Sequence, residues 1–280
     1  MLTKRQLKNV FSENGFTPLK RFGENYLIDG NIKDMVMSHA RIAEGQAILE
    51  IGAGLGALTL DLAESGAAVF AVEKDRKAFL ILKDLAGDDF PNLKIFNEDI
   101  LKFDLRKIAS RGKVKVIGNL PYYITTPVIE YLIQNRNLIT TILMMVQREV
   151  ANRLLACPGT KDYSSISCFV QYYIRPEYIH TVKRTSFYPS PKVDSSLVRL
   201  NVLDKPLVEA DDEKLFFKIV RGAFNQRRKS ILNSLSRERV LNISKEALSK
   251  ILARIPIDPS IRPESLTLSD FASIANAVSG

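Results

Sequence analysis

Residues 46–65 read QAILEIGAGLGALTLDLAES, and this stretch decides the fold. Residues 46–51 form an apolar run of strand length, and residues 56–65 place leucine and alanine at helical spacing. Between these two runs, Gly52, Gly54 and Gly56 stand on alternate positions. Glycine lets the chain turn sharply and lets a ligand approach the backbone closely. The stretch therefore predicts a strand, a ligand-binding turn and a helix.

The same alternation of strand and helix continues along the chain to about residue 200. Further strand-like runs are residues 67–72, 93–97, 113–119 and 140–146, and helical patterns cover residues 75–85 and 125–135. This order predicts an α/β domain with a mainly parallel, Rossmann-like sheet and helices on both faces. Residues 177–184 and 193–202 are two strands without a full helix between them, so we expect an antiparallel pair at one sheet edge.

The pattern changes to helices alone after residue 203. Residues 211–225, 227–235, 244–255 and 267–278 are helical, and Thr267 and Asp270 have the spacing of a capping box. We therefore predict two domains. Residues 1–203 form the ligand-binding sheet domain, with an N-terminal segment over the ligand, and residues 204–280 form a small all-helical domain.

The overall composition narrows the class of protein. No apolar run reaches the roughly 18–20 residues of a membrane span, and the N-terminus lacks the apolar core of a secretory signal. Glu13 and Glu24 argue against a mitochondrial leader. Two cysteines and two histidines are too few and too scattered for a zinc site, so we predict no metal and a reducing, cytoplasmic location. The net charge of +9 favours a nucleic-acid partner.

Two acidic residues follow the next strands. Glu73 ends the second strand, where a dinucleotide-binding pattern expects an acid for the ribose hydroxyls, and Gly52, Gly54 and Ala57 satisfy that pattern's glycine loop. Asp99 follows the third strand, where its carboxylate can accept a hydrogen bond from an adenine amine. Both NAD and S-adenosylmethionine contain adenosine, so these residues leave both cofactors open.

The sequence NLPY at residues 119–122 indicates which chemistry is performed. The N6 amine of adenine is a poor nucleophile because its lone pair is delocalised into the ring. Acceptors on its two N–H groups, the Asn119 side-chain oxygen and a backbone carbonyl near Leu120 or Pro121, favour a more tetrahedral nitrogen. Pro121 stiffens the turn, and Tyr122 can stack on the base. This arrangement predicts a methyltransferase that uses S-adenosylmethionine, with no charged general base.

Two other segments carry candidate site residues. Phe187, in FYPSPKVDSS (187–196), precedes a proline-stiffened loop, and we predict that it contacts the base face opposite Tyr122, with Tyr188 as the alternative for this role. The segment FGENYLID (22–29) precedes the first strand and is expected to fold over the cofactor. There, Asn25 can bond the methionine part through its side chain and Leu27 through its backbone.

At these residues the sequence resembles the bacterial small-subunit ribosomal RNA adenine N6,N6-dimethyltransferases of the KsgA (RsmA) type. The resemblance covers nearly the whole chain and includes FGENYLID, EIGAGLGALT, VEKD, EDILKFD, GNLPYYITTPVI, MVQREVANR, FYPSPKVDSS and FNQRRKSILNSL. A departure is Glu24, where the family often has glutamine. Because Asn25 and Leu27 remain, cofactor binding is not put in doubt.

The resemblance implies dimethylation of two adjacent adenosines near the 3′ end of 16S ribosomal RNA, late in small-subunit assembly. It also implies which residues contact S-adenosylmethionine, namely Asn25, Leu27, Gly52, Glu73, Asp99 and Asn119. To this set we add Gly54. It assigns the target base to Asn119, Leu120, Pro121, Tyr122 and Phe187. We expect a monomer.

A basic surface completes the prediction. Arg227, Arg228 and Lys229 are expected to begin a helix and to contact RNA phosphates; Arg148 and Arg153, and Lys4, Arg5 and Lys8, can extend that surface. Three alternatives stay open. They are the related large-subunit RNA methyltransferases that confer antibiotic resistance, a non-catalytic assembly or transcription factor of the same fold, and an NAD-dependent oxidoreductase. The last is disfavoured because no residues suited to hydride transfer surround the glycine turn.

Overall fold

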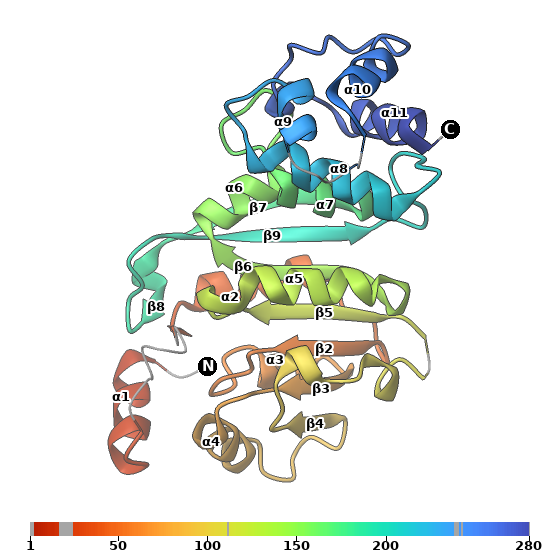
Figure 1. Cartoon of the computed structure of the whole chain (residues 1–280). Coiled ribbons are helices and arrows are strands. Elements are labelled where there is room, and N and C mark those ends of the chain that lie inside the picture. The colour runs from red at the N-terminus through yellow and green to blue at the C-terminus, as the bar shows by residue number, and fades with distance from the viewer. Residues whose placement is uncertain (1–2, 17–24, 111, 238–240, 242, 280) are drawn as a thin grey trace. The chain divides into compact units, whose positions relative to one another are not determined.

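The predicted sheet is present in the computed structural model, which describes residues 3–16, 25–110, 112–237, 241 and 243–279 (Figure 1). Seven strands lie in the order β4-β3-β2-β5-β6-β9-β7. Their bounds are β2 Ala47–Ile51, β3 Ala68–Val72, β4 Leu93–Phe96, β5 Val114–Asn119, β6 Ile139–Gln147, β7 Ile174–Val182 and β9 Ser195–Val202. The five strands from β4 to β6 are parallel, and β9 runs antiparallel to β6. The strand-like runs predicted from the sequence are thus confirmed, with β9 and β7 as neighbours at one edge.

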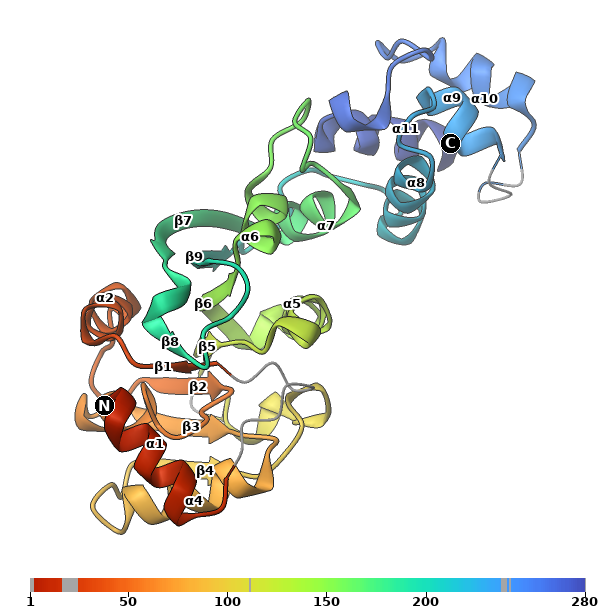
Figure 2. The same ribbon diagram turned by 90° about the vertical axis from the view of Figure 1, so that its left-hand side faces the viewer.

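Helices cover both faces of this sheet. In the first part of the chain they are α2 Gly30–Ala40, α3 Thr59–Glu64, α4 Arg76–Ala86 and α5 Thr125–Gln134, whereas α1 Lys4–Glu13 packs with Tyr26, Leu55 and α4. Figure 2 shows α2 and α5 on opposite sides of the sheet. The central strands are therefore covered on both faces, which explains why nearly all residues of β2 and β5 are buried.

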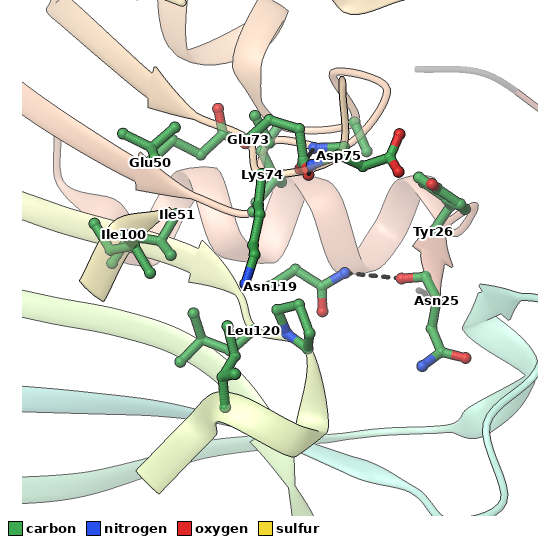
Figure 3. Close-up of a pocket in the computed structure, with 18 of the residues that line it drawn as sticks. Asn25, Tyr26, Glu50, Ile51, Glu73, Lys74, Asp75, Ile100, Asn119 and Leu120 are labelled. Atoms are coloured by element: carbon green, nitrogen blue, oxygen red, sulfur yellow. Dashed lines mark hydrogen bonds between the residues drawn. The ribbon is translucent and has the colours of Figure 1, made fainter. Parts of the chain in front are cut away.

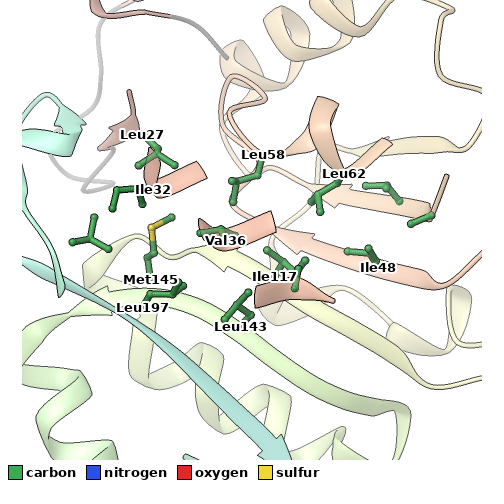
Figure 4. Packing of buried hydrophobic residues seen from close by; sticks show 14 of the residues in the cluster. Leu27, Ile32, Val36, Ile48, Leu58, Leu62, Ile117, Leu143, Met145 and Leu197 are labelled. Carbon is green, nitrogen blue, oxygen red and sulfur yellow. The ribbon is translucent and has the colours of Figure 1, made fainter. Parts of the chain in front are cut away.

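A large hydrophobic core lies between α2, α3 and one face of the sheet (Figure 4). Val36 of α2, Leu62 of α3 and Ile117 of β5 are each at most 1% exposed. Burial of such side chains contributes about 1.5–3 kcal/mol each. This packing fixes the sheet against the helices, and with it the ends of the strands where a ligand would bind.

A second, two-stranded sheet holds the N-terminal segment in place. β1 (Tyr26–Leu27) pairs antiparallel with β8 (Phe187–Tyr188), so that Leu27 faces Phe187. Directly after β1, Asp29 caps α2, and its Oδ2 accepts a hydrogen bond of 2.8 Å from the Ser186 hydroxyl. Residues far apart in the sequence thereby fix one wall of the site.

The chain divides into two compact units. The first comprises residues 1–151 and 177–202, and the second residues 152–176 and 203–280. The predicted division at 203/204 lies one residue from the observed division at 202/203, but the prediction placed residues 152–176 with the sheet, whereas they group with the helices. The aromatic rings of α7 explain this, because Tyr172 packs on Phe216 of α8 at 4.7 Å between ring centroids.

The second unit is helical, as predicted. Its helices are α7 Ser165–Tyr173, α8 Glu213–Asn225, α9 Ile231–Arg237, α10 Lys245–Leu252 and α11 Leu268–Ser279, and α6 Arg148–Leu155 crosses between the units. The predicted capping box of α11 is confirmed, because Thr267 and Asp270 exchange hydrogen bonds of 2.8 and 3.1 Å between backbone N–H groups and side chains. In the described part of the chain no helix has the length and apolar character needed to span a membrane.

Candidate active site

A pocket opens at the carboxyl ends of β2, β3 and β5, with about 990 Å³ of empty space including its open mouth. It lies where the strand order reverses between β2 and β5, which is the usual ligand crevice of an open α/β sheet. Its lining includes most of the predicted residues, namely Asn25, Leu27, Gly52, Gly54, Glu73, Asp99, Asn119, Leu120, Pro121 and Tyr122. The sequence pattern therefore identified the pocket.

The glycine turn is fixed by both backbone conformation and space. Gly52, Gly54 and Gly56 have φ of 73°, 56° and 84°, a region that other residues rarely adopt. A Cβ at Gly54 would lie 3.1 Å from Cε1 of the Tyr26 ring, and one at Gly56 would lie 2.7 Å from Cδ1 of Leu82. The turn thus presents bare backbone to the pocket.

The Glu73 carboxylate holds this turn together. Its Oε2 accepts a hydrogen bond of 2.8 Å from the Gly54 N–H, and its Oε1 accepts one of 2.7 Å from the Asp75 N–H. Burial raises the pKa of Glu73, and the backbone N–H groups of Asp75 and Gly54 oppose that rise. Each carboxylate oxygen keeps a second lone pair, so the predicted contact with ribose hydroxyls stays a prediction that this geometry permits.

Asp99 is paired with a lysine that the sequence did not single out. Lys74 lies 2.9 Å from Asp99 Oδ2, and the same carboxylate caps a short helix, η2 (Ile100–Lys102), through the Leu101 N–H. Burial works against ionisation of Asp99, but the Lys74 and Leu101 contacts outweigh it and hold its pKa below the usual value. Asp99 is therefore an anionic acceptor, and its contact with adenine stays a prediction.

Glu50 forms part of the pocket wall and is 2% exposed. Among the described residues, its Oε2 and the Thr59 hydroxyl are buried without a hydrogen-bond partner. Burial raises the pKa of Glu50 to about 7, the nearby Thr59 hydroxyl opposes this rise, and the neighbouring Glu73 charge adds to it. A buried carboxylate oxygen without a hydrogen-bond partner suits a pocket whose ligand carries positive charge.

Asn119 ends β5 and is oriented by the N-terminal segment. Its side-chain Nδ2 donates a hydrogen bond of 3.0 Å to the backbone carbonyl of Asn25, as Figure 3 shows. Because the amide nitrogen is engaged there, the amide oxygen is left to accept a hydrogen bond from another group.

The carbonyls of Leu120 and Pro121, the two candidates for the second acceptor, differ in the hydrogen bonds that they accept. The Pro121 carbonyl accepts hydrogen bonds from the Ile124 N–H at 3.2 Å and the Thr125 hydroxyl at 3.3 Å. Within the described residues, the Leu120 carbonyl accepts none. The Leu120 carbonyl is therefore the more available acceptor of the two, and its contact with the target amine stays a prediction.

Two adjacent tyrosines lie on the pocket wall in the short helix η4 (Tyr122–Ile124). The Tyr122 hydroxyl lies 2.8 Å from the Ser195 hydroxyl oxygen. Burial raises the pKa of Tyr122, although the Ser195 contact opposes that rise, so this side chain is a neutral phenol. Tyr123, which the sequence did not single out, is 48% exposed.

Phe187 lies apart from this group. It is 2% exposed, packs in the core between α2, α3 and the sheet together with Leu27 and Leu197, and does not belong to the pocket lining. The reason is the pairing of β8 with β1, since alternate residues of a strand point to opposite faces. Phe187 turns to the core, and Tyr188 packs against Phe11 of α1. Its predicted contact with the base stays a prediction.

The basic residues predicted to contact RNA differ in their exposure and in their contacts. Arg227, Arg228 and Lys229 do not begin a helix as predicted but lie in the turn before α9. The Arg227 Nη2 donates hydrogen bonds of 2.8 Å to the carbonyls of Lys161 and Tyr163 and lies 3.5 Å from Glu264 Oε2, so its side chain is bound within the protein. Arg228 and Lys229 are exposed, as are Arg148 and Arg153 on α6.

Residues 17–24, which include Glu24, lie outside the described residues. In the part of the chain that the structure describes, no cluster of three or more His, Cys, Asp or Glu side chains could hold a metal ion. Cys168 is buried and Cys157 is exposed, and both are free thiols.

Comparison with known proteins places this geometry in a family. The ribosomal RNA adenine dimethylase profile matches residues 15–278. The chain is 41% identical to a protein named ribosomal RNA small subunit methyltransferase A from Alkaliphilus oremlandii, over 97% of this chain and 96% of that protein. It is 40% identical to a protein of the same name from Bacillus mycoides, over 99% and 96%.

Two solved structures agree with this assignment in fold. A dimethyladenosine transferase from Plasmodium falciparum is 25% identical with a TM-score of 0.74, covering 89% of this chain and 95% of that one. The 23S rRNA methyltransferase ErmE is 23% identical with a TM-score of 0.70, covering 91% and 100%. The family match extends over both units, and the chain therefore belongs to the ribosomal RNA adenine dimethylase family.

Proposed function

We propose that this protein dimethylates the N6 amines of two adjacent adenosines near the 3′ end of small-subunit ribosomal RNA. The observation that carries the proposal is the position of Asn119. Its amide nitrogen is held by the Asn25 carbonyl, and its amide oxygen is left as an acceptor in the same pocket as the glycine turn.

S-adenosylmethionine supplies the methyl group from its sulfonium centre. The residues present suit this positively charged cofactor, because the glycine turn offers bare backbone and Oε2 of the buried Glu50 carboxylate lacks a hydrogen-bond partner among the described residues. We assign the cofactor to Asn25, Leu27, Gly52, Gly54, Glu73, Asp99 and Asn119. Glu73 fits the ribose hydroxyls and Asp99 the adenine amine, since both are acceptors at the ends of adjacent strands.

The chain's own residues activate the target amine by orientation. The Asn119 amide oxygen and the Leu120 carbonyl accept hydrogen bonds from the two N–H groups, so the nitrogen lone pair turns toward the methyl group. Fixed acceptors in a pocket of this kind stabilise the positive charge that develops on the nitrogen. Tyr122 contributes a stacking surface that holds an unstacked base, a contact worth about 1–3 kcal/mol.

RNA binding is assigned to the exposed basic residues and the helical unit. Arg148, Arg153, Arg228 and Lys229 are exposed and can contact phosphates. Arg227 is assigned to the fold of the turn, because its guanidinium donates to backbone carbonyls. The protein acts as a monomer in the cytoplasm. Light scattering of the purified chain tests the monomeric state, and cell fractionation tests the location.

The test uses radiolabelled S-adenosylmethionine with small ribosomal subunits that lack these methyl groups, and separately with large-subunit RNA and with DNA. Products are digested to nucleosides, and Asn119→Ala is the control. We expect N6,N6-dimethyladenosine from small subunits alone, and none with the variant. Label in large-subunit RNA would move the function to the resistance type. Cofactor binding without transfer to any substrate would identify a non-catalytic assembly factor.

A further inference from the structure

The hydroxyl groups of Tyr122 and Ser195 join two segments that are distant in the sequence. The two oxygens are 2.8 Å apart, and either group can be the donor. Tyr122 belongs to the turn that follows β5, and Ser195 is the first residue of β9. The contact therefore connects the base-binding turn to a strand that contributes no residue to the pocket lining.

Ser195 is held firmly on its own side of this contact. It is 1% exposed and pairs with Gln147 in the antiparallel ladder between β9 and β6. The preceding residue, Asp194, accepts a hydrogen bond from the Arg148 N–H at 3.1 Å and another from the Arg184 N–H at 2.9 Å. Ser195 is thus a fixed point of the sheet.

Tyr122 is held less firmly by its own element. The helix η4 has three residues, none of them buried, and its N-cap provides no side-chain hydrogen bond. An aromatic side chain in such a turn can still rotate about its first two side-chain torsions. A hydrogen bond at the far end of the ring, from a fixed partner, restricts both rotations.

We propose that Ser195 is a positioning residue, which fixes the ring of Tyr122 in the orientation needed for methyl transfer and matters most for the second transfer to the same amine. This inference rests on the proposed function. The second transfer demands more of the ring, because the monomethylated amine is bulkier and must present its lone pair with the first methyl group turned aside. Small misplacements of reacting groups can cost up to about 10²-fold in rate.

The test compares Ser195→Ala, Tyr122→Phe and the double variant, with Ser196→Ala as the matched control. Ser196 is 2% exposed and lies on the same strand, but its side chain points to the opposite face. Each protein methylates unmodified small subunits under single-turnover conditions, and N6-methyladenosine and N6,N6-dimethyladenosine are counted against time. Affinity for S-adenosylmethionine is measured by calorimetry and folding by thermal unfolding.

We expect Ser195→Ala and Tyr122→Phe each to slow the second transfer about tenfold, or about 1.4 kcal/mol, with the first transfer and the cofactor affinity changed much less. N6-Methyladenosine then accumulates. The double variant should be no slower than either single variant, and Ser196→Ala should match the wild type. Multiplying effects in the double variant, or an unchanged product ratio for Tyr122→Phe, would overturn the inference. Failure of the wild type to form dimethyladenosine would instead refute the proposed function.

Discussion

Glu50 is a buried acid whose ionised form the fold disfavours. Burial raises its pKa from 4.5 to about 7, so the folded chain binds more protons than the unfolded chain between these values. Stability from this group is therefore fully present below pH 4.5 and is lost as the pH rises through 7. A difference of this size corresponds to about 3 kcal/mol.

We expect Glu50→Gln to remove this dependence. The free energy of unfolding of the variant, minus that of the wild type, should rise by up to about 3 kcal/mol between pH 4.5 and pH 7.5. Urea unfolding at several pH values without cofactor measures it, and the other titrating groups cancel in the difference. Parallel curves for the two proteins would show that Glu50 is ionised at low pH in the fold.

The role of the glycine turn in cofactor binding can be tested at Gly54, with Gly45 as the matched control. Both have positive φ, of 56° and 69°, so alanine should cost about 1–2 kcal/mol of stability at either position. Only at Gly54 would the new Cβ meet a neighbour, the Tyr26 ring at 3.1 Å, whereas nothing lies within 4 Å at Gly45. We expect Gly54→Ala to weaken binding of S-adenosylmethionine at least about tenfold and Gly45→Ala to leave it unchanged, as calorimetry can measure. Equal affinities would mean that the ring moves aside.

The residues of the site were predictable only where one segment carries the signal. The glycine turn, Glu73, Asp99 and Asn119 each follow a strand, and parallel strands bring their carboxyl ends to one edge. The contacts that orient them could not be predicted, because Asn119 meets Asn25 and Tyr122 meets Ser195 across long stretches of chain. The same limit explains Phe187, whose direction depends on the pairing of β8 with β1.

At the scale of elements, the strands were easier to predict than the helices. Apolar runs bounded by glycine and polar residues located the strands of the main sheet to within a few residues. Helix α1 was missed although Thr3 and Gln6 form a capping box, which is a usable signal. Helix α7 gives less warning, since its sequence SISCFVQYY is apolar on most faces and shows no clear helical stripe.

The turn before α9 separates a structural arginine from its exposed neighbour. Arg227 donates to the carbonyls of Lys161 and Tyr163, and hydrogen bonds to charged groups contribute about 1.5–3 kcal/mol each. We expect Arg227→Ala to destabilise the protein by about 2–3 kcal/mol in denaturant unfolding. Arg228→Ala should change stability by less than about 0.5 kcal/mol.

For binding to small-subunit RNA we expect the reverse order, with a larger effect from Arg228→Ala than from Arg227→Ala. Arg228→Ala removes a phosphate contact, which weakens RNA binding. The negative slope of the logarithm of the binding constant against the logarithm of the salt concentration should become less steep by about 1. Titrations at several salt concentrations measure this slope. A stable Arg227→Ala variant with a reduced slope would return Arg227 to the RNA-binding surface.

At the scale of the whole molecule, the helical unit is not a detachable tail. Residues 152–176 belong to it and lie between β6 and β9 in the sequence. The rings of Phe169 and Tyr173 in α7 pack on Phe217 of α8 at 5.3 and 5.8 Å between centroids. A chain that ends at Val202 keeps α7 but loses its partners.

We expect this shortened chain to expose the aromatic face of α7. It should bind the dye ANS and aggregate, which fluorescence and light scattering can follow, with the full chain as the control. A monomeric shortened chain that binds no dye would show that α7 finds other cover.

The pairing of β1 with β8 also has a consequence for biosynthesis. One wall of the pocket, with Tyr26 and Leu27, is held by Tyr188 and Phe187, which leave the ribosome much later than the glycine turn. A growing chain can form the first strands and helices as they emerge, but it cannot complete the pocket until β8 is outside the exit tunnel. A protein that we propose modifies ribosomes thus gains a complete cofactor site only when most of its own translation is finished.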